Sequence, residues 1–214
     1  EENLSSIGIQ MTYANLDTEE IKRFREVFSI EDLSDWYQKL LDEYHKWLSY
    51  SLKWKKERNE SLQNLEFPFP YREGQRKMVG SVYHSISAGR QIFIQAPTGV
   101  GKTMSTIFPA VRAVGEGKGE TIFYLTAKTI TRTVAEEAFA VLQEKGMKYK
   151  VVTITAKDKL CFMEETKCNP AHCPYAKGHF DRVNDAVYEL WTSSHVYDRQ
   201  TILGQAEKRQ VCPF

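Results

Sequence analysis

The chain has 214 residues, enough for one α/β domain of ordinary size with a smaller attachment. A formal net charge of +1 excludes a globally basic protein, so any surface for nucleic acid must be local. The hydrophobic content of 42% is ordinary, and no apolar run reaches the roughly 18 residues that a membrane helix requires. The chain begins without Met and stops within a pattern, so we expect a fragment of a longer protein.

The N-terminal part, 1–66, has the pattern of a strand followed by helices. Residues 7–14 alternate loosely and carry β-branched and aromatic side chains, which predicts a strand with no partner nearby. Acidic residues and then apolar ones at helical spacing predict a helix over residues 17–28. A capping signal at residues 29–32 begins a long helix to about Asn64. We interpret its stripe of Leu, Trp and Tyr as a packing face rather than a ligand site.

Prolines at 68 and 70 end that helix, and we place the start of the main domain at Phe67. Beyond it, apolar runs alternate with helix-compatible segments, which predicts an α/β fold with a parallel sheet and right-handed crossovers. The turns after parallel strands meet at one sheet edge, where ligands gather. Strands are expected at 92–94, 121–126 and 150–155, and helices at 72–88, from the glycine-rich loop to about Gly115, and at 129–145.

A glycine-rich stretch, QIFIQAPTGVGKT at residues 91–103, joins an apolar run to a helix-compatible segment. That order of strand, loop and helix is what a phosphate-binding loop (P-loop) needs. Ala96 replaces the first glycine of the pattern G-x-x-x-x-G-K-[ST] and is small enough for that place. We predict that Lys102 binds the β- and γ-phosphates of ATP and that Thr103 ligates Mg²⁺; the alternative is a chance turn. The nucleotide would contact Thr98, Gly99, Val100, Gly101, Lys102 and Thr103.

An aromatic ring, a cation and an amide precede the loop at Tyr71, Arg72 and Gln75. A glutamine amide can bond the edge of adenine and an aromatic ring can stack on the base, so this group is a candidate for nucleotide recognition. The alternative is an ordinary polar helix start. With a P-loop following, adenine recognition by Arg72 and Gln75 is the favoured interpretation.

All the cysteines of the chain lie near its C-terminal end, at Cys161, Cys168, Cys173 and Cys212. Four thiolates bind Zn²⁺ or an iron–sulfur cluster, and the spacing C-x₆-C-x₄-C followed by a distant fourth Cys favours neither. Separate buried thiols or a disulfide are the alternatives. A nucleotide-binding loop indicates a reducing, cytoplasmic compartment, where clustered cysteines more often bind metal. The segment has little core of its own and would need such a staple.

Hydroxyls and lysines follow the second and third predicted strands. Thr126, Lys128 and Thr129 open a helix at the end of one strand, and Lys157 and Lys159 repeat the arrangement after the next. Side chains of this kind at helix starts suit a phosphate backbone, which makes them candidate nucleic-acid contacts. Short lysine groups are also commonly just solvated.

From about Phe67 to Phe214 the chain resembles the first motor domain of the XPD/DinG-type superfamily 2 DNA helicases. The similarity rests on the order of YREGQ at 71–75, the P-loop, LTAKT at 125–129 and KDKLC at 157–161, with the four cysteines after them. The resemblance implies a RecA-like parallel sheet flanked by helices and a mostly helical Cys-rich insertion that contacts DNA. It assigns Cys161, Cys168, Cys173 and Cys212 to a [4Fe–4S] cluster.

The N-terminal part, 1–66, is similar to the connector of a bacterial branch in which a PD-(D/E)XK nuclease precedes the helicase, although no nuclease motif is present here. The implied domains are this attachment (1–66), part of motor domain 1 (67–156) and the iron–sulfur domain (157–214). A D-E-A-H-like motif and a second motor domain are also lacking, so the chain alone should hydrolyse ATP poorly or not at all.

The resemblance therefore implies a fragment of an ATP-dependent helicase that moves on single-stranded or forked DNA, with ATP, Mg²⁺ and a [4Fe–4S] cluster. Two alternatives stay open. One is a P-loop ATPase with a Cys₄ zinc module for nucleic-acid or protein interaction, without unwinding. The other is a structural domain with a vestigial P-loop.

Overall fold

Helix α1 (Ile30–Gln63) links the two units into which the chain divides, Glu1–Leu52 and Lys53–Phe214. The computed structural model describes residues 4–214. The predicted domain boundaries include residues 1–3, which lie outside the described part. Within residues 4–214, no helix has the length and apolar character that crossing a membrane requires.

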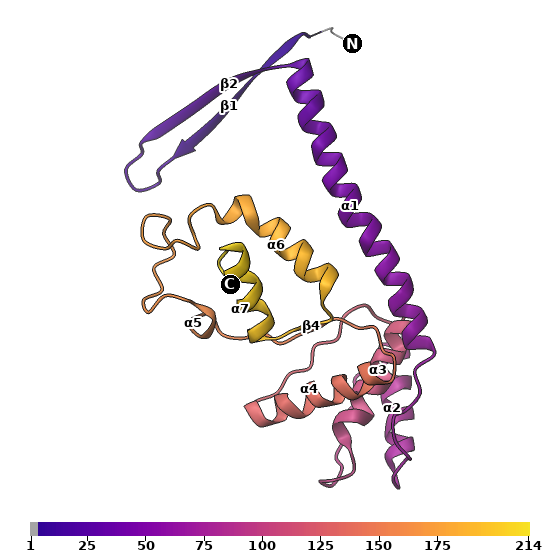
Figure 1. Ribbon diagram of the computed structural model, residues 1–214. Helices are drawn as coiled ribbons and strands as arrows, with labels where there is room; N and C mark the ends of the chain where they lie inside the picture. The colour runs from indigo at the N-terminus through magenta and orange to yellow at the C-terminus, as the bar shows by residue number, and fades with distance from the viewer. Residues whose placement is uncertain (1–3) are drawn as a thin grey trace. The chain divides into compact units, whose positions relative to one another are not determined.

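A two-stranded hairpin opens the chain (Figure 1). Strand β1 (Ser6–Ala14) pairs antiparallel with β2 (Ile21–Ser29). The prediction of a strand at 7–14 is confirmed, but the expected absence of a partner and the helix over 17–28 are wrong. The cause is a tight reversal, in which the Asn15 side-chain oxygen accepts the backbone N–H groups of Asp17 and Thr18 at 2.9 and 3.1 Å. The aromatic and β-branched residues of β2 then pair across the hairpin instead of forming a helical stripe.

The capping signal predicted for α1 is confirmed. The Ser29 hydroxyl accepts the Asp32 N–H at 3.1 Å, and the Asp32 carboxylate accepts the Ser29 N–H at 3.2 Å. The packing interpretation of the stripe fails over the first unit, where Trp36 is 61% exposed and Tyr44 and Leu52 are equally open. Only after residue 52 does α1 become part of a core.

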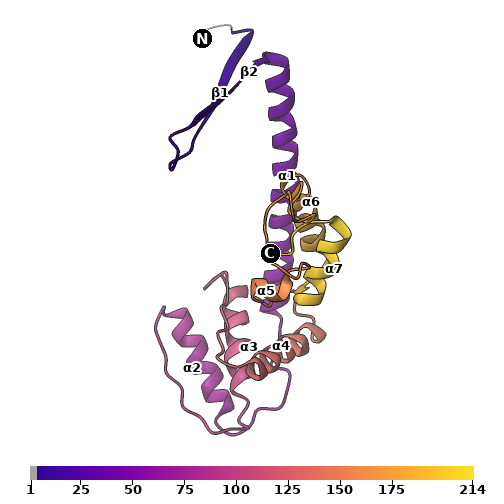
Figure 2. The same cartoon turned by 90° about the vertical axis from the view of Figure 1, so that its left-hand side faces the viewer.

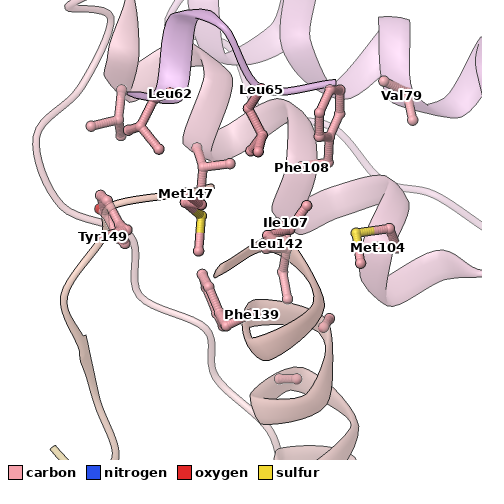
Figure 3. Close-up of a cluster of buried hydrophobic side chains, with 14 residues drawn as sticks. Leu62, Leu65, Val79, Met104, Ile107, Phe108, Phe139, Leu142, Met147 and Tyr149 are labelled. Carbon is pink, nitrogen blue, oxygen red and sulfur yellow. The ribbon is translucent and has the colours of Figure 1, made fainter. Parts of the chain in front are cut away.

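The core of the second unit lies where four helices meet (Figures 2 and 3). They are the end of α1, α2 (Gln75–Ser87), α3 (Lys102–Gly115) and α4 (Thr129–Glu144), of which the last three confirm the predicted helices. Leu62 and Leu142 are fully buried and face Ile107 of α3 across this core. Met147 and Tyr149, just after α4, close it. Because α3 contributes more buried residues than its neighbours, it is the central helix.

The C-terminal ends of α1 and α3 approach closely. A Cβ added at Gly115 would lie 2.6 Å from the Leu62 Cβ and 3.2 Å from the Gln63 backbone nitrogen. The Gln63 amide donates to the Gly115 carbonyl at 2.7 Å. The Arg112 guanidinium donates to the carbonyls of Leu62 and Gln63 in the last turn of α1 and to that of Leu65 just beyond it, and so helps to satisfy the acceptors at this helix end. The helix end is therefore both packed and capped by α3.

The predicted three-stranded parallel sheet is not formed in residues 4–214. The strand expected at 150–155 is reduced to β3 (Val151–Val152), which pairs parallel with β4 (Val196–Tyr197). Strand β4 was not predicted from the sequence. Residues 92–94 and 121–126 run without any backbone–backbone hydrogen bond among the described residues. Phe123 and Leu125 are 77% and 88% exposed. An apolar strand of this kind is buried only when neighbours pair with it and cover it, and the described residues place none beside it.

The Cys-rich segment folds into short helices. They are α5 (Lys157–Leu160), α6 (His179–Ser193) and α7 (Arg199–Arg209). Helix α6 agrees with the mostly helical character expected of this segment. Helices α6 and α7 lie side by side, as Figures 1 and 2 agree, around a small core of Ala186, Ala206 and Val211. Glu189 of α6 accepts hydrogen bonds from Lys208, Gln205 and Arg209 of α7. Polar contacts thus join α6 and α7 beside their small core.

Replacing Gly115 by Ala should lower the free energy of unfolding by about 1–3 kcal/mol, because the new methyl group overlaps Leu62 and the α1 backbone. Gly80→Ala in α2 is the matched control, since no atom lies within 4 Å of its added Cβ, and it should be neutral or stabilising. Urea unfolding of both variants measures the difference. Equal effects would show that the α1–α3 contact is loose.

Acid should weaken the α6–α7 contact. Hydrogen bonds from Lys208, Gln205 and Arg209 lower the pKa of Glu189 from 4.5 to about 2. A carboxylate with a depressed pKa stabilises the fold fully above pH 4.5, and that contribution is lost as the pH falls toward 2. Glu189→Gln should therefore show a smaller drop in melting temperature between pH 6 and pH 3 than the wild type. Glu207→Gln on the exposed side of α7 is the control and should follow the wild type.

Candidate nucleotide and nucleic-acid site

The P-loop stands at the N-terminus of the central helix. Gly99 and Gly101 have φ of 83° and 80°, in the left-handed region that favours glycine. Gly101 is the N-cap of α3 and has no side chain to cap the first turn. The first N–H groups of a helix need an acceptor, and a phosphate is the acceptor that such a loop is shaped to take.

Lys102 is folded back onto its own loop. Its Nζ donates to the carbonyls of Ala96 at 2.9 Å and Pro97 at 2.8 Å. Both are ordinary hydrogen bonds to neutral oxygens, which a charged phosphate oxygen would replace with stronger ones. Thr103, the predicted Mg²⁺ ligand, follows in the first turn of α3. Thr98 and Val100 lie in the same loop and complete the predicted nucleotide contacts.

Arg72 and Gln75 contact the P-loop directly. The Arg72 guanidinium donates to the Gly99 carbonyl. Gln75 is 4% exposed, its amide oxygen accepts the Arg72 N–H at 3.0 Å, and a Cβ added at Gly101 would lie 2.5 Å from its amide nitrogen. In this arrangement the Gln75 amide supports the loop. Tyr71 stacks on Phe67 with ring centroids 4.3 Å apart, so one of its faces is occupied.

The four cysteines come together around one small cavity of about 30 Å³. Lys157 and Lys167 also line it, and all four thiols are free. Although they share this cavity, no three His, Cys, Asp or Glu side chains among residues 4–214 lie close enough together to hold a metal ion. His179 accepts the Cys212 N–H through Nδ1 at 3.1 Å, so its ring is used in positioning the chain.

The candidate nucleic-acid residues fall into two groups. Thr126, Lys128 and Thr129 line a hollow of about 820 Å³, together with Arg132. The Thr126 hydroxyl donates to the Lys128 carbonyl at 2.7 Å and fixes the turn into α4. Lys157 and Lys159 lie elsewhere: the Lys157 ammonium sits 5.1 Å from the Phe214 ring, and the Lys159 carbonyl accepts from Arg199 at 2.8 Å.

The part that carries the P-loop and the turn into α4 is basic although the chain as a whole is not. Residues 67–156 hold twelve Lys and Arg against six Asp and Glu, a net charge of +6. The excess is offset mainly by the acidic N-terminal part, 1–66, with nine Lys and Arg against fourteen Asp and Glu. A local excess of this kind attracts polyanions such as nucleic acid.

A cluster around Lys150 was missed by the sequence reasoning. The Lys150 Nζ lies 4.4 Å from the Trp54 ring centroid and donates to carbonyls of Trp191 and Ser194. The His195 ring lies 4.8 Å from that of Trp54. Trp54 lies in the predicted long helix but outside its apolar stripe, which ends at Leu52, and nothing in its spacing indicates partners so far along the chain.

Comparison with known proteins agrees with this geometry. The profile of the DEAD/DEAH box helicases matches residues 72–187, more than half of the chain. A protein of Methanocaldococcus jannaschii described as a probable ATP-dependent helicase is 28% identical over 123 residues. The match covers 56% of this chain and 18% of that relative, so the chain spans only a small part of its length. No solved structure was found to match.

The profile begins at Arg72, takes in the P-loop and the basic turn into α4, and ends within α6. A P-loop with left-handed glycines, its lysine at the start of a central helix, and a mixed α/β architecture fit the RecA-like fold of such motors. The chain belongs to the DEAD/DEAH box helicase family.

Proposed function

We propose that the chain is part of an ATP-dependent DNA helicase that couples ATP hydrolysis to movement on single-stranded DNA and to duplex unwinding. The observation that carries the proposal is the P-loop at the head of α3, inside the region that matches the helicase profile. A second motor domain and an acidic Mg²⁺-binding motif are needed for efficient hydrolysis, so turnover belongs to a longer protein containing this chain.

At the P-loop, ATP would draw Lys102 away from the Ala96 and Pro97 carbonyls. The ammonium would then offset charge on the β- and γ-phosphates, and the Thr103 hydroxyl would help to hold the Mg²⁺ that accompanies ATP. Arg72 holds the loop at the Gly99 carbonyl while this exchange takes place. These residues position the phosphates, and positioning with charge stabilisation is most of what phosphoryl transfer requires.

DNA would meet the basic turn formed by Thr126, Lys128 and Thr129. Hydroxyls and a lysine at the start of α4 are suited to phosphates rather than bases, so binding there should depend on salt and not on sequence. Lys157 and Lys159 are proposed as further backbone contacts near the Cys-rich segment. A single-stranded or forked substrate is proposed from the family resemblance.

The residues around the small cavity fit an iron–sulfur cluster in kind. Cys161, Cys168, Cys173 and Cys212 offer four thiols, and Lys157 beside them would offset the negative charge of four thiolates. Bound there, a [4Fe–4S] cluster would supply a rigid four-point crosslink and a one-electron redox centre. The cysteines would hold it, and α6 and α7 would order around it.

A zinc-bearing ATPase without unwinding activity is the second candidate. Four thiols around one cavity are equally a donor set for tetrahedral Zn²⁺. In that case the Cys-rich segment is an interaction module for nucleic acid or protein.

Lys102→Ala should weaken Mg²⁺-ATP binding by the chain about 10- to 100-fold, the value of a lost charged hydrogen bond. It should abolish ATPase activity in the longer protein. The exposed Lys118→Ala, beyond the end of α3, is the control and should bind like the wild type. Titration with a fluorescent ATP analogue gives both values. Retained turnover in the Lys102 variant would refute the assignment of the loop.

Protein prepared without oxygen should be brown, with about four irons per chain and absorbance at about 400 nm. Cys173→Ser should lose both, because one of four ligands is gone. Met163→Leu changes a side chain of the same cavity without removing a thiol, so it should keep the colour. Stoichiometric zinc without iron would favour the second candidate.

A further inference from the structure

The last turns of α1 contact two distant parts of the second unit. Leu62 and Gln63 meet the C-terminal end of α3, and Trp54 meets Lys150 and His195. Eight residues of helix, about 12 Å, separate the two contacts. Residues 54–62 of α1, called the strut below, therefore contact α3 at one end and Lys150 and the Cys-rich segment at the other.

The contact of Leu62 and Gln63 with α3, the lower of the two, is tightly packed. Leu62 is fully buried, and Gly115 leaves no room for even a methyl group beside it. Arg112 donates to two carbonyls in the last turn of α1 and to one just beyond it. It also pairs with Glu116, which accepts from Tyr83 of α2. A shift of α3 must therefore move the end of α1 or break these bonds.

The contact of Trp54 with Lys150 and His195, the upper of the two, lies beside the paired strands β3 and β4. Lys150 immediately precedes β3, and His195 immediately precedes its partner β4. The Lys150 Nζ sits over the Trp54 ring, donates to the Ser194 carbonyl at 3.1 Å and to the Tyr197 hydroxyl at 2.9 Å, and so joins both strands to α1.

Burial in this cluster disfavours the charged forms of Lys150 and His195. Burial lowers the pKa of Lys150 to about 8. Burial and then the nearby charges of Lys150 and Lys148 lower the pKa of His195, against the opposing effect of Glu57. The Lys150 ammonium is held by the Trp54 ring, the Ser194 carbonyl and the Tyr197 hydroxyl, so a shift of α1 at Trp54 would expose a cation that is now half-buried.

We propose that residues 54–62 of α1 couple nucleotide binding at the P-loop to the closing of the Trp54 cluster at the base of the Cys-rich segment. The inference rests on the proposed function in one respect, which is that ATP binds at Lys102 and Thr103. ATP orders the loop and α3, α3 fixes the end of α1, and α1 holds Trp54 against Lys150 and His195. Coupling is reciprocal, so loosening the cluster must weaken ATP binding by the same factor.

Hydrogen exchange of the whole 214-residue chain, with and without Mg²⁺-ATP, tests the proposal. ATP should slow exchange of the amides of residues 195–197 about fivefold, the lower end of ordinary allosteric coupling. Trp54→Leu should remove this response and weaken ATP binding by a similar factor, although it lies far along α1 from the loop. Arg112→Met cuts the other end of the strut and should do the same.

Trp36→Leu is the matched control, because it makes the same change on the same helix at an exposed place in the first unit. It should leave both the ATP response and the affinity unchanged. If ATP binds but exchange at 195–197 does not respond, or if both strut variants keep the response, the coupling is refuted while the P-loop assignment stands. If ATP does not bind at all, both fail together.

Discussion

The close approach of Leu62 to Gly115 is the contact on which the second unit depends. It is possible only because α3 ends on a residue without a side chain, and Arg112 then caps the carbonyls that α1 leaves open. Through it the end of α1 becomes part of the hydrophobic core of the second unit. The P-loop stands at the opposite end of α3, about 20 Å away along a helix of this length. The P-loop and the contact with α1 thus lie at opposite ends of one helix.

The segments at 92–94 and 121–126, which flank the P-loop in the sequence, are not paired into a sheet in residues 4–214. Apolar extended chain without paired backbone groups is a sheet edge that requires neighbours. The helices around α3 can pack without them, because Ile107, Leu142 and Leu62 bury one another. The P-loop glycines therefore have their left-handed conformation although residues 4–214 do not form the predicted parallel sheet. The same helices leave the basic turn at Lys128 open beside the hollow.

Local patterns of the sequence predicted local structure well. The Ser29–Asp32 cap, the P-loop and the helices α2, α3 and α4 follow from caps, glycines and periodicity. Periodicity misled where tertiary pairing decides: Phe24 and Phe28 suit a helix or a strand, and the turn at Asn15 selects the strand. The sheet failed because strand pairing is non-local. The Trp54, Lys150 and His195 cluster joins residues far apart in the chain, and a single sequence carries no signal for it.

The central claim is that this P-loop belongs to a DNA-driven motor. DNA-stimulated ATP hydrolysis by a longer protein that contains the chain, followed together with separation of a forked duplex, tests it most directly. The account predicts that single-stranded DNA accelerates hydrolysis and that the fork separates only when ATP is present. ATP hydrolysis that DNA does not change, with the fork left intact, would contradict it.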